Sequence, residues 1–209
     1  KIPLVTTIHH PISKDLKFQL KSTKSIFLKF LMIRWHSFLR MQIKVAKKLN
    51  SVIVVSKSSK QDIHDDFGLK KEAMKVILNG IDTEAFFPDE NIKKIPFRIV
   101  TSASADVPLK GLDYLLEAFS KVIKIFPDST LQIIGSSKQG GHTSRKINDL
   151  NIKEKVQFNN DLTFKEVRDL YCSADVVVIP SLYEGFGFAI GEAMACRVPV
   201  ITTSGGAIP

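Results

Sequence analysis

Short apolar runs alternate with amphipathic stretches along most of the second half of the chain. The runs are rich in β-branched residues and too short for helices, so they predict buried strands. Apolar positions at helical spacing between them predict helices. The predicted strands cover 97–103, 130–134, 155–158, 175–179 and 198–202, and the predicted helices cover 111–125, 142–150, 163–171 and 188–196. Such alternation predicts an α/β protein with a parallel sheet, which binds ligands at the carboxyl edge of its strands.

The first half shows a looser version of the same pattern. A buried strand is predicted over 2–8, ended by His9-His10-Pro11, with short strands over 52–55 and 76–78. Ser56 is placed to cap a helix over 57–67 that Gly68 ends. Residues 83–96 contain two prolines and mixed charge, and they predict a linker. We therefore expect two domains, 1–95 including the linker and 96–209.

One long helix is predicted over residues 24–49. Its core-facing side is predicted to carry Phe27, Leu31, Trp35, Phe38, Val45 and Leu49, and its polar side Lys29, His36, Arg40, Lys44 and Lys47. The stretch from Lys14 to Lys48 holds ten Lys or Arg and one Asp, so it accounts for the whole net charge of +9. Two interpretations stay open, a solvated helix face or contact with an anionic membrane surface. Without a nucleic-acid motif, this local charge does not predict nucleic-acid binding.

A glycine-rich loop follows the predicted strand at 175–179 and opens the next helix. It reads Glu184-Gly-Phe-Gly-Phe-Ala-Ile-Gly-Glu192. Gly185 and Gly187 let a ligand approach the backbone, and the N–H groups of Phe186 to Phe188 are placed to face phosphate oxygens at a helix N-terminus. Glu184 and Glu192 can accept hydrogen bonds from sugar and ribose hydroxyls. A single glutamate here would suggest only a surface or capping residue, but the whole pattern predicts a nucleotide-sugar site.

Other candidates follow the other predicted strand ends. Ser104 to Lys110 follow the strand at 97–103, and Gly135 follows the strand at 130–134. Lys110 offers a point charge for a diphosphate, and Gly111 lets a helix begin close to a ligand. His9 ends a strand in the other domain and is expected to face a cleft between the domains. A lone His is more often a core or cap residue, and a lone Lys at a helix start is more often solvated.

Several chemistries lack their sequence signatures. Cys172 and Cys196 have neither disulfide-framework nor metal spacing, which favours a reducing cytoplasm. The sequence has no Asp-x-Asp dyad, dinucleotide fingerprint, Gly-Lys-Ser/Thr phosphate loop or Gly-x-Ser-x-Gly elbow. No apolar run reaches the ~18 residues of a membrane span. The chain opens in a strand and stops in a loop, so we expect an internal piece of a longer protein.

The ordered set of motifs resembles the family-four group of retaining glycosyltransferases, which have the GT-B architecture. The resemblance spans nearly the whole chain. It rests on Thr7-Ile-His-His-Pro, Val54-Val-Ser, Asn79-Gly-Ile-Asp, Pro108-Leu-Lys-Gly, Leu131-Gln-Ile-Ile-Gly, Pro180-Ser-Leu-Tyr-Glu-Gly-Phe-Gly, Gly191-Glu-Ala-Met-Ala, Pro199-Val-Ile and Gly205-Gly206. The Glu-x7-Glu spacing in this setting is its most specific part.

The resemblance implies two Rossmann-like parallel-sheet domains, both incomplete here, facing a cleft. Residues 1–95 would belong to the acceptor-side domain and 96–209 to the nucleotide-sugar domain. Lys110 would bind the donor diphosphate, Glu184 the sugar on its reacting face, Glu192 the ribose, and His9 the sugar from the acceptor side. Many members carry an Arg where this chain has Ser104, so its phosphate neutralisation would differ.

The resemblance also implies direct transfer of a sugar with retention of configuration, without a cofactor or bound metal. The expected acceptor is a glycan or a lipid-linked molecule, and the expected location is the cytoplasm, peripheral to the membrane where helix 24–49 contacts it. Two alternatives stay open. One is a phosphorylase or hydrolase on the same architecture, and the other is a non-catalytic module that binds a nucleotide sugar or a membrane.

Overall fold

The computed structural model describes residues 4–209 of the chain. These residues form two compact units. The first unit contains residues up to 79 together with 183–186 and 204–209, and the second contains 80–182 and 187–203. The described part of the chain is α/β in both units, with parallel strands only, as the sequence predicts.

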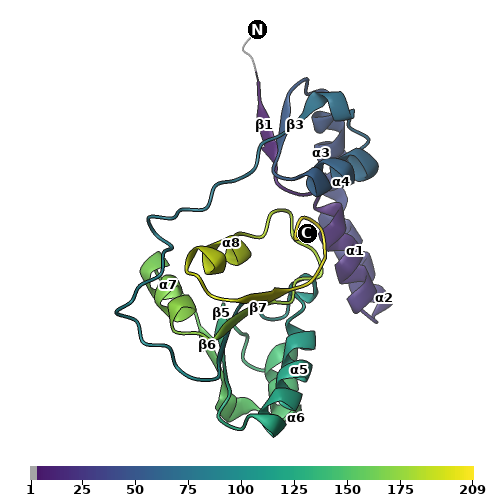
Figure 1. Cartoon of the computed structure of the whole chain (residues 1–209). Coiled ribbons are helices and arrows are strands. Elements are labelled where there is room, and N and C mark those ends of the chain that lie inside the picture. The colour runs from purple at the N-terminus through teal and green to yellow at the C-terminus, as the bar shows by residue number, and fades with distance from the viewer. Residues whose placement is uncertain (1–3) are drawn as a thin grey trace. The chain divides into compact units, whose positions relative to one another are not determined.

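The second unit is built on a doubly wound parallel sheet (Figure 1). Its strands among the described residues lie in the order β6-β5-β4-β7-β8. They are β4 (Arg98–Ser102), β5 (Thr130–Ile134), β6 (Val156–Asn159), β7 (Val176–Ile179) and β8 (Val200–Thr202). The chain adds strands on one side of β4, then returns to add β7 and β8 on the other. The order therefore reverses between β4 and β7, and such a switch point leaves a crevice at the carboxyl ends of the two strands.

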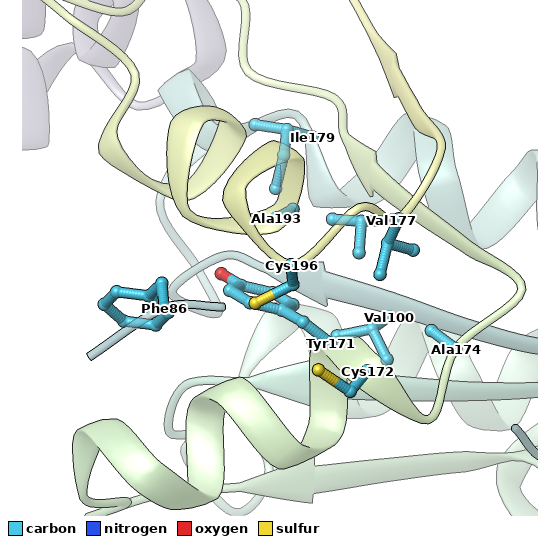
Figure 2. Close-up of a cluster of buried hydrophobic side chains, with 10 residues drawn as sticks. Phe86, Val100, Tyr171, Cys172, Ala174, Val177, Ile179, Ala193 and Cys196 are labelled. Atoms are coloured by element: carbon cyan, nitrogen blue, oxygen red, sulfur yellow. The ribbon is translucent and has the colours of Figure 1, made fainter. Parts of the chain in front are cut away.

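Helices cover both faces of this sheet and bury two separate cores. Helices α5 (Leu112–Ile125) and α6 (His142–Asp149) cover one face, where Leu116, Phe119 and Leu131 are fully buried. Helices α7 (Phe164–Cys172) and α8 (Phe188–Ala195) cover the other. Figure 2 shows Tyr171 and Cys196 packed against strand residues such as Val100 and Val177 in this second core. Cys172 and Cys196 are buried free thiols.

The segment from Ile77 to Phe97 has no helix or strand and is attached to the second unit along part of its length. Phe86 is buried in the α7–α8 core. Arg168 of α7 stacks 4.4 Å from the Phe87 ring centroid and lies 3.3 Å from a carboxylate oxygen of Asp89. The second unit also contains short 3-10 turns at Pro108–Lys110 and Lys153–Lys155.

The first unit has a smaller parallel sheet, ordered β1-β2-β3 within the described residues. Its strands are β1 (Thr6–Ile8), β2 (Val52–Val54) and β3 (Met74–Val76), with a 3-10 turn at Lys71–Ala73 before β3. Helix α4 (Lys57–Phe67) is capped by the Ser56 hydroxyl and ends at a left-handed Gly68, as predicted. The predicted buried strand at 2–8 is only partly confirmed. Its described residues form an edge strand with Thr7 exposed, and residues 1–3 lie outside the described chain.

The predicted single helix over 24–49 is wrong. Helix α1 (Ser13–Ser22), which the pattern did not predict, comes first, followed by α2 (Ile26–Trp35), a 3-10 turn at His36–Phe38 and α3 (Leu39–Ala46). At the turn the Nδ1 atom of His36 lies 2.8 Å from the backbone oxygen of Met32. The helix tightens there, and the residues that follow face in new directions.

The predicted core face of this segment is wrong at five of its six positions. Phe27 and Trp35 are 68% and 78% exposed, and Leu31, Phe38 and Val45 are also exposed. Leu49 is half-buried and packs against the core, as predicted. His36, assigned to the polar side, is buried. The buried core residues of the segment are Leu39 and Ala46, seven positions apart on α3, and Ile43 packs beside them. The change of direction at the 3-10 turn breaks the continuous stripe that the sequence suggested.

Candidate functional site

The loops that follow β4 and β7 meet at the switch point of the second unit. The backbone N–H of Leu182, in the loop after β7, donates to the backbone oxygen of Leu109 over 2.8 Å. Gly111 lies against the carbonyl of Pro180, so closely that an added Cβ would overlap its oxygen and lie 2.9 Å from its carbon. Gly111 also has φ +64°, a left-handed conformation that favours glycine. The two loops named as candidates from sequence are therefore joined through their backbones.

The loop after β5 is joined to the loop after β4 in the same way. Gly135 has φ +149°, and a Cβ there would come within 2.6 Å of the backbone oxygen of Ala103. The N–H of Ala105 donates to the backbone oxygen of Ser136 over 3.3 Å. Three strand ends thus support one another along the carboxyl edge, which fixes the backbone on which Ser104 and Lys110 lie.

Lys110 lies in this supported loop, at a slightly different place from the one predicted. It ends the 3-10 turn at Pro108–Lys110, and α5 begins two residues later at Leu112, after left-handed Gly111. Lys110 is half-buried, whereas Ser104 is exposed. A half-buried ammonium in a fixed loop is suited to a phosphate oxygen, because less of its charge is screened by solvent.

Helix α8 begins at the glycine-rich loop, with left-handed Gly187 as its N-cap. Phe188 is its first residue, and the backbone N–H groups of the first turn of a helix point toward its N-terminal end. Glu192 follows one turn later, and burial raises the pKa of its carboxyl group. Figure 2 shows Ala193, the next residue, pointing into the core beneath the helix. A half-buried carboxylate beside a helix start is a suitable acceptor for a pair of ribose hydroxyls.

The first half of the motif groups with the first unit. The backbone of Glu184 is hydrogen-bonded to the segment after β8, with Ala207 N–H donating to Glu184 O over 2.9 Å. The hydroxyl of Ser59, on α4, lies 2.9 Å from the backbone oxygen of His9 and 3.2 Å from that of Gly185. His9 is exposed. A Cβ added to Gly185 would lie 2.9 Å from the backbone oxygen of His9. The backbones of His9 and Gly185 are therefore adjacent in this unit.

The structure brings the predicted residues together in two sets. The second unit holds Ser104, Lys110, Gly111, Gly135, Gly187, Phe188 and Glu192, and the first unit holds His9, Glu184, Gly185 and Phe186. The sequence reasoning missed Asp106 and Thr143, which connect the β4 loop to α6. Thirty-seven residues separate them, and no local motif marks the pair. Among residues 4–209, no cluster of three or more His, Cys, Asp or Glu is arranged to hold a metal ion.

A doubly wound sheet with a glycine-rich loop at its switch point defines a class of nucleotide-binding α/β proteins. Within that class, the sequence matches the family "Glycosyl transferases group 1" over residues 96–209 and "Glycosyltransferase Family 4" over residues 1–85. The chain belongs to this glycosyltransferase family, which confirms the resemblance.

Similar proteins include a curated relative from Mycolicibacterium hassiacum, "MMP alpha-(1->4)-mannosyltransferase", 38% identical over 99% of this chain and 49% of its own length. The "O-antigen chain mannosyltransferase RfbU" of Salmonella typhimurium is 28% identical over 96% of this chain and 56% of its own. Among solved structures, Anabaena Alr3699/HepE in complex with UDP-glucose superposes with a TM-score of 0.74 at 22% identity, covering 98% of this chain and 54% of that one. The chain spans about half the length of these proteins, and the solved structure agrees with the predicted GT-B fold.

Proposed function

We propose that the protein containing this chain is a glycosyltransferase that moves a sugar from a nucleotide-sugar donor to an acceptor hydroxyl with retention of configuration. The observation that carries the proposal is the meeting of the β4 and β7 loops at the switch point. It supports a diphosphate site near Lys110 and the start of α8, with Glu192 one turn further on. The name of the Anabaena complex makes UDP-glucose the first donor to try, and the names of the two mannosyltransferase relatives make a nucleotide-linked mannose the second.

In the proposed reaction the anomeric carbon loses its bond to the donor phosphate and gains one to the acceptor oxygen on the same face. The acceptor proton moves to an oxygen of the departing diphosphate. Lys110 and the backbone N–H groups at the start of α8 stabilise the charge that builds on the diphosphate. Glu184 and His9 line the sugar, and Glu192 holds the ribose. No step requires a metal or a cofactor, because the lysine and the helix start supply the positive charge. We propose a glycan or lipid-linked molecule as the acceptor.

The test is donor turnover by the intact protein and its variants Lys110→Ala and Glu184→Ala. Each is expected to lose at least ~100-fold in kcat, the effect of removing a group that stabilises transition-state charge. Lys124→Ala is the matched control, since Lys124 is exposed at the far end of α5 from Lys110. Full activity in Lys110→Ala would refute its role. Release of free sugar or sugar phosphate without an acceptor would favour a hydrolase or phosphorylase, and an inverted anomer in the NMR spectrum would refute retention.

We further propose that the protein docks on an anionic membrane surface through α2 and α3, while the rest of it lies in the cytoplasm. The support is an exposed apolar surface beside a concentration of positive charge. Ile26 and Phe30 are 84% and 61% exposed, and Trp35 and Met41 are also exposed. Lys24, Lys29 and Arg34 lie in the same stretch. Apolar side chains enter the headgroup region and cations attract anionic lipid, at about 1 kcal/mol per Lys or Arg. No helix among residues 4–209 is long and apolar enough to cross a bilayer.

Co-sedimentation with vesicles tests this second proposal. The intact protein is expected to sediment with vesicles of phosphatidylcholine and phosphatidylglycerol, and not with phosphatidylcholine alone. The double variants Phe27→Ser/Trp35→Ser and Lys29→Glu/Arg34→Glu should each release it, whereas Lys153→Glu, a charge change in the other unit, should not. Equal binding to both vesicle types, or unchanged binding of both double variants, would overturn the proposal. Concentration-dependent association without lipid would instead identify a second copy as the occupant.

A further inference from the structure

A reciprocal pair of contacts anchors the middle of the β4 loop to helix α6. The backbone N–H of Asp106 donates to the Thr143 hydroxyl over 3.0 Å. In return, the Asp106 carboxylate accepts the backbone N–H of Thr143 over 2.9 Å and its hydroxyl over 3.0 Å. We refer to these two residues and their hydrogen bonds as the Asp106–Thr143 clamp. It lies between Ser104 and Lys110, the two candidate phosphate ligands of the loop.

The local structure is shaped around this clamp. Thr143 is 1% exposed, so its hydroxyl depends on Asp106 and not on water. Asp106 has φ +59°, a left-handed conformation that is costly for most residues and tolerated by Asp and Asn. A Cβ at Gly141 would overlap the Asp106 carboxylate and lie 2.9 Å from the backbone oxygen of Lys138, so glycine is the residue that fits before α6. Hydrogen bonds from Thr143, above all from its backbone N–H, hold the pKa of Asp106 below its usual value.

Backbone hydrogen bonds hold the β4 loop on both sides of Asp106, and the clamp holds it at Asp106 itself. Ala105 N–H bonds to Ser136 O on one side, and Leu109 O accepts Leu182 N–H on the other. Between those two points, the clamp ties Asp106 to α6. A charged ligand group requires a fixed position, because catalytic and binding geometry tolerates errors of well under 1 Å.

We propose that Asp106 and Thr143 are positioning residues for the donor diphosphate, acting through the loop that carries Ser104 and Lys110 and touching no ligand themselves. The inference rests on the proposed function. Glu192 lies on α8, outside the clamped loop, so loss of the clamp should weaken contacts to the diphosphate while leaving those to the nucleoside. The clamp therefore determines how much affinity the second phosphate of the donor contributes.

The experiment compares a nucleoside diphosphate with its monophosphate by calorimetric titration of the intact protein. UDP, GDP and ADP are each titrated into the wild type, and the one that binds is carried forward with its monophosphate. Thr143→Val removes the hydroxyl at nearly constant volume and is expected to weaken diphosphate binding about tenfold, with monophosphate binding nearly unchanged. Thr143→Ser restores the hydroxyl and should recover most of the loss. Asp106→Asn, which tolerates the left-handed backbone, should fall between the wild type and Thr143→Val.

Two controls keep a structural effect apart from a positioning effect. Asp113 pairs with His142 over 2.7 Å and also connects α5 to α6, but at an exposed site outside the loop. Asp113→Asn should therefore leave the ratio of the two affinities unchanged. Hydrogen exchange of residues 104–110 without nucleotide should speed up in Thr143→Val and not in Asp113→Asn.

Each outcome has one meaning. Equal diphosphate affinity in Thr143→Val and wild type overturns the clamp's role and leaves the proposed function standing. Equal losses for monophosphate and diphosphate mean general damage and also overturn the role. Failure of the folded wild-type protein to bind any of the three diphosphates overturns the proposed function, and the clamp's role falls with it.

Discussion

Replacing Gly111 by alanine tests whether the β4 and β7 loops are in direct backbone contact. Two penalties combine at this position. The left-handed backbone at φ +64° costs an L-residue about 1–2 kcal/mol. The new methyl group also overlaps the carbonyl of Pro180, and forcing extra volume into a packed site typically costs about 1–3 kcal/mol. Because the overlapping atoms belong to backbone, no side-chain rotation relieves them. We expect Gly111→Ala to lower the free energy of unfolding by about 3 kcal/mol.

Two other glycines separate these penalties. Gly140 has φ +70° with nothing within 4 Å of an added Cβ, so Gly140→Ala measures the conformational cost alone, about 1 kcal/mol. Gly80 has neither a left-handed backbone nor a neighbour within 4 Å, so Gly80→Ala should change stability by less than about 0.5 kcal/mol. Urea unfolding followed by far-UV circular dichroism gives the comparison. With an m-value of about 2 kcal/mol/M, Gly111→Ala should lower the midpoint by about 1.5 M without changing m. A midpoint shift no larger than that of Gly140→Ala would refute the close approach.

Two further predictions follow from buried charge. Burial raises the pKa of Glu192 above its ordinary 4.5, so over the range just above that value the native state holds a proton that the unfolded state has released. Stability from this group is then present at low pH and lost as pH rises through the native pKa. Glu192→Gln should therefore raise the urea midpoint of unfolding more at pH 7.5 than at pH 4, and it should also weaken nucleotide binding. Equal midpoint shifts at the two pH values would contradict the reasoning. The Arg168 side chain is 10% exposed and lies 2.9 Å from an Asp169 oxygen, so Arg168→Ala should lower the free energy of unfolding by about 3 kcal/mol in the same urea assay. Lys165, in the same helix, has a 72% exposed side chain, so Lys165→Ala should lower it by less than about 0.5 kcal/mol.

The sequence predicted the second unit closely. The predicted strand at 130–134 coincides with β5, and the helix predicted over 111–125 differs from α5 by one residue. Here periodicity, capping and burial agree, since each strand is covered on both faces and each helix buries one side. At α7 the Thr163 and Glu166 side chains form a capping box, which a Thr and a Glu three residues apart predict from local sequence.

In the first unit, the sequence pattern did not predict helix α1, the exposure of α2 or the turn between α2 and α3. Helix α1 contains no buried residue, so no apolar stripe marked it. Helix α2 is apolar on nearly all sides and also buries no residue, so its pattern suggested a core face that the described chain does not have. The turn at His36 includes a contact between its Nδ1 atom and the Met32 carbonyl, and the spacing of apolar residues does not predict such a contact.

Local motifs identified most residues of the candidate site, and tertiary contacts supplied the rest. The glycine-rich loop and Lys110 carry their chemistry in short sequence patterns. The Asp106–Thr143 clamp depends on the β4 loop meeting the start of α6 across 37 positions, and only the folded sheet edge brings them together. A left-handed Asp in the middle of a loop is its one local sign, and backbone conformation is not visible in sequence.

The most direct test of the proposed donor site is a calorimetric titration of the intact, folded protein with UDP, GDP and ADP, repeated on Lys110→Ala and Glu192→Ala. We predict saturable binding of one nucleotide by the wild type, and loss of that binding in both variants. Binding that survives in both variants would contradict the assigned site, and a folded wild-type protein that binds none of the three would contradict the proposed nucleotide-sugar function.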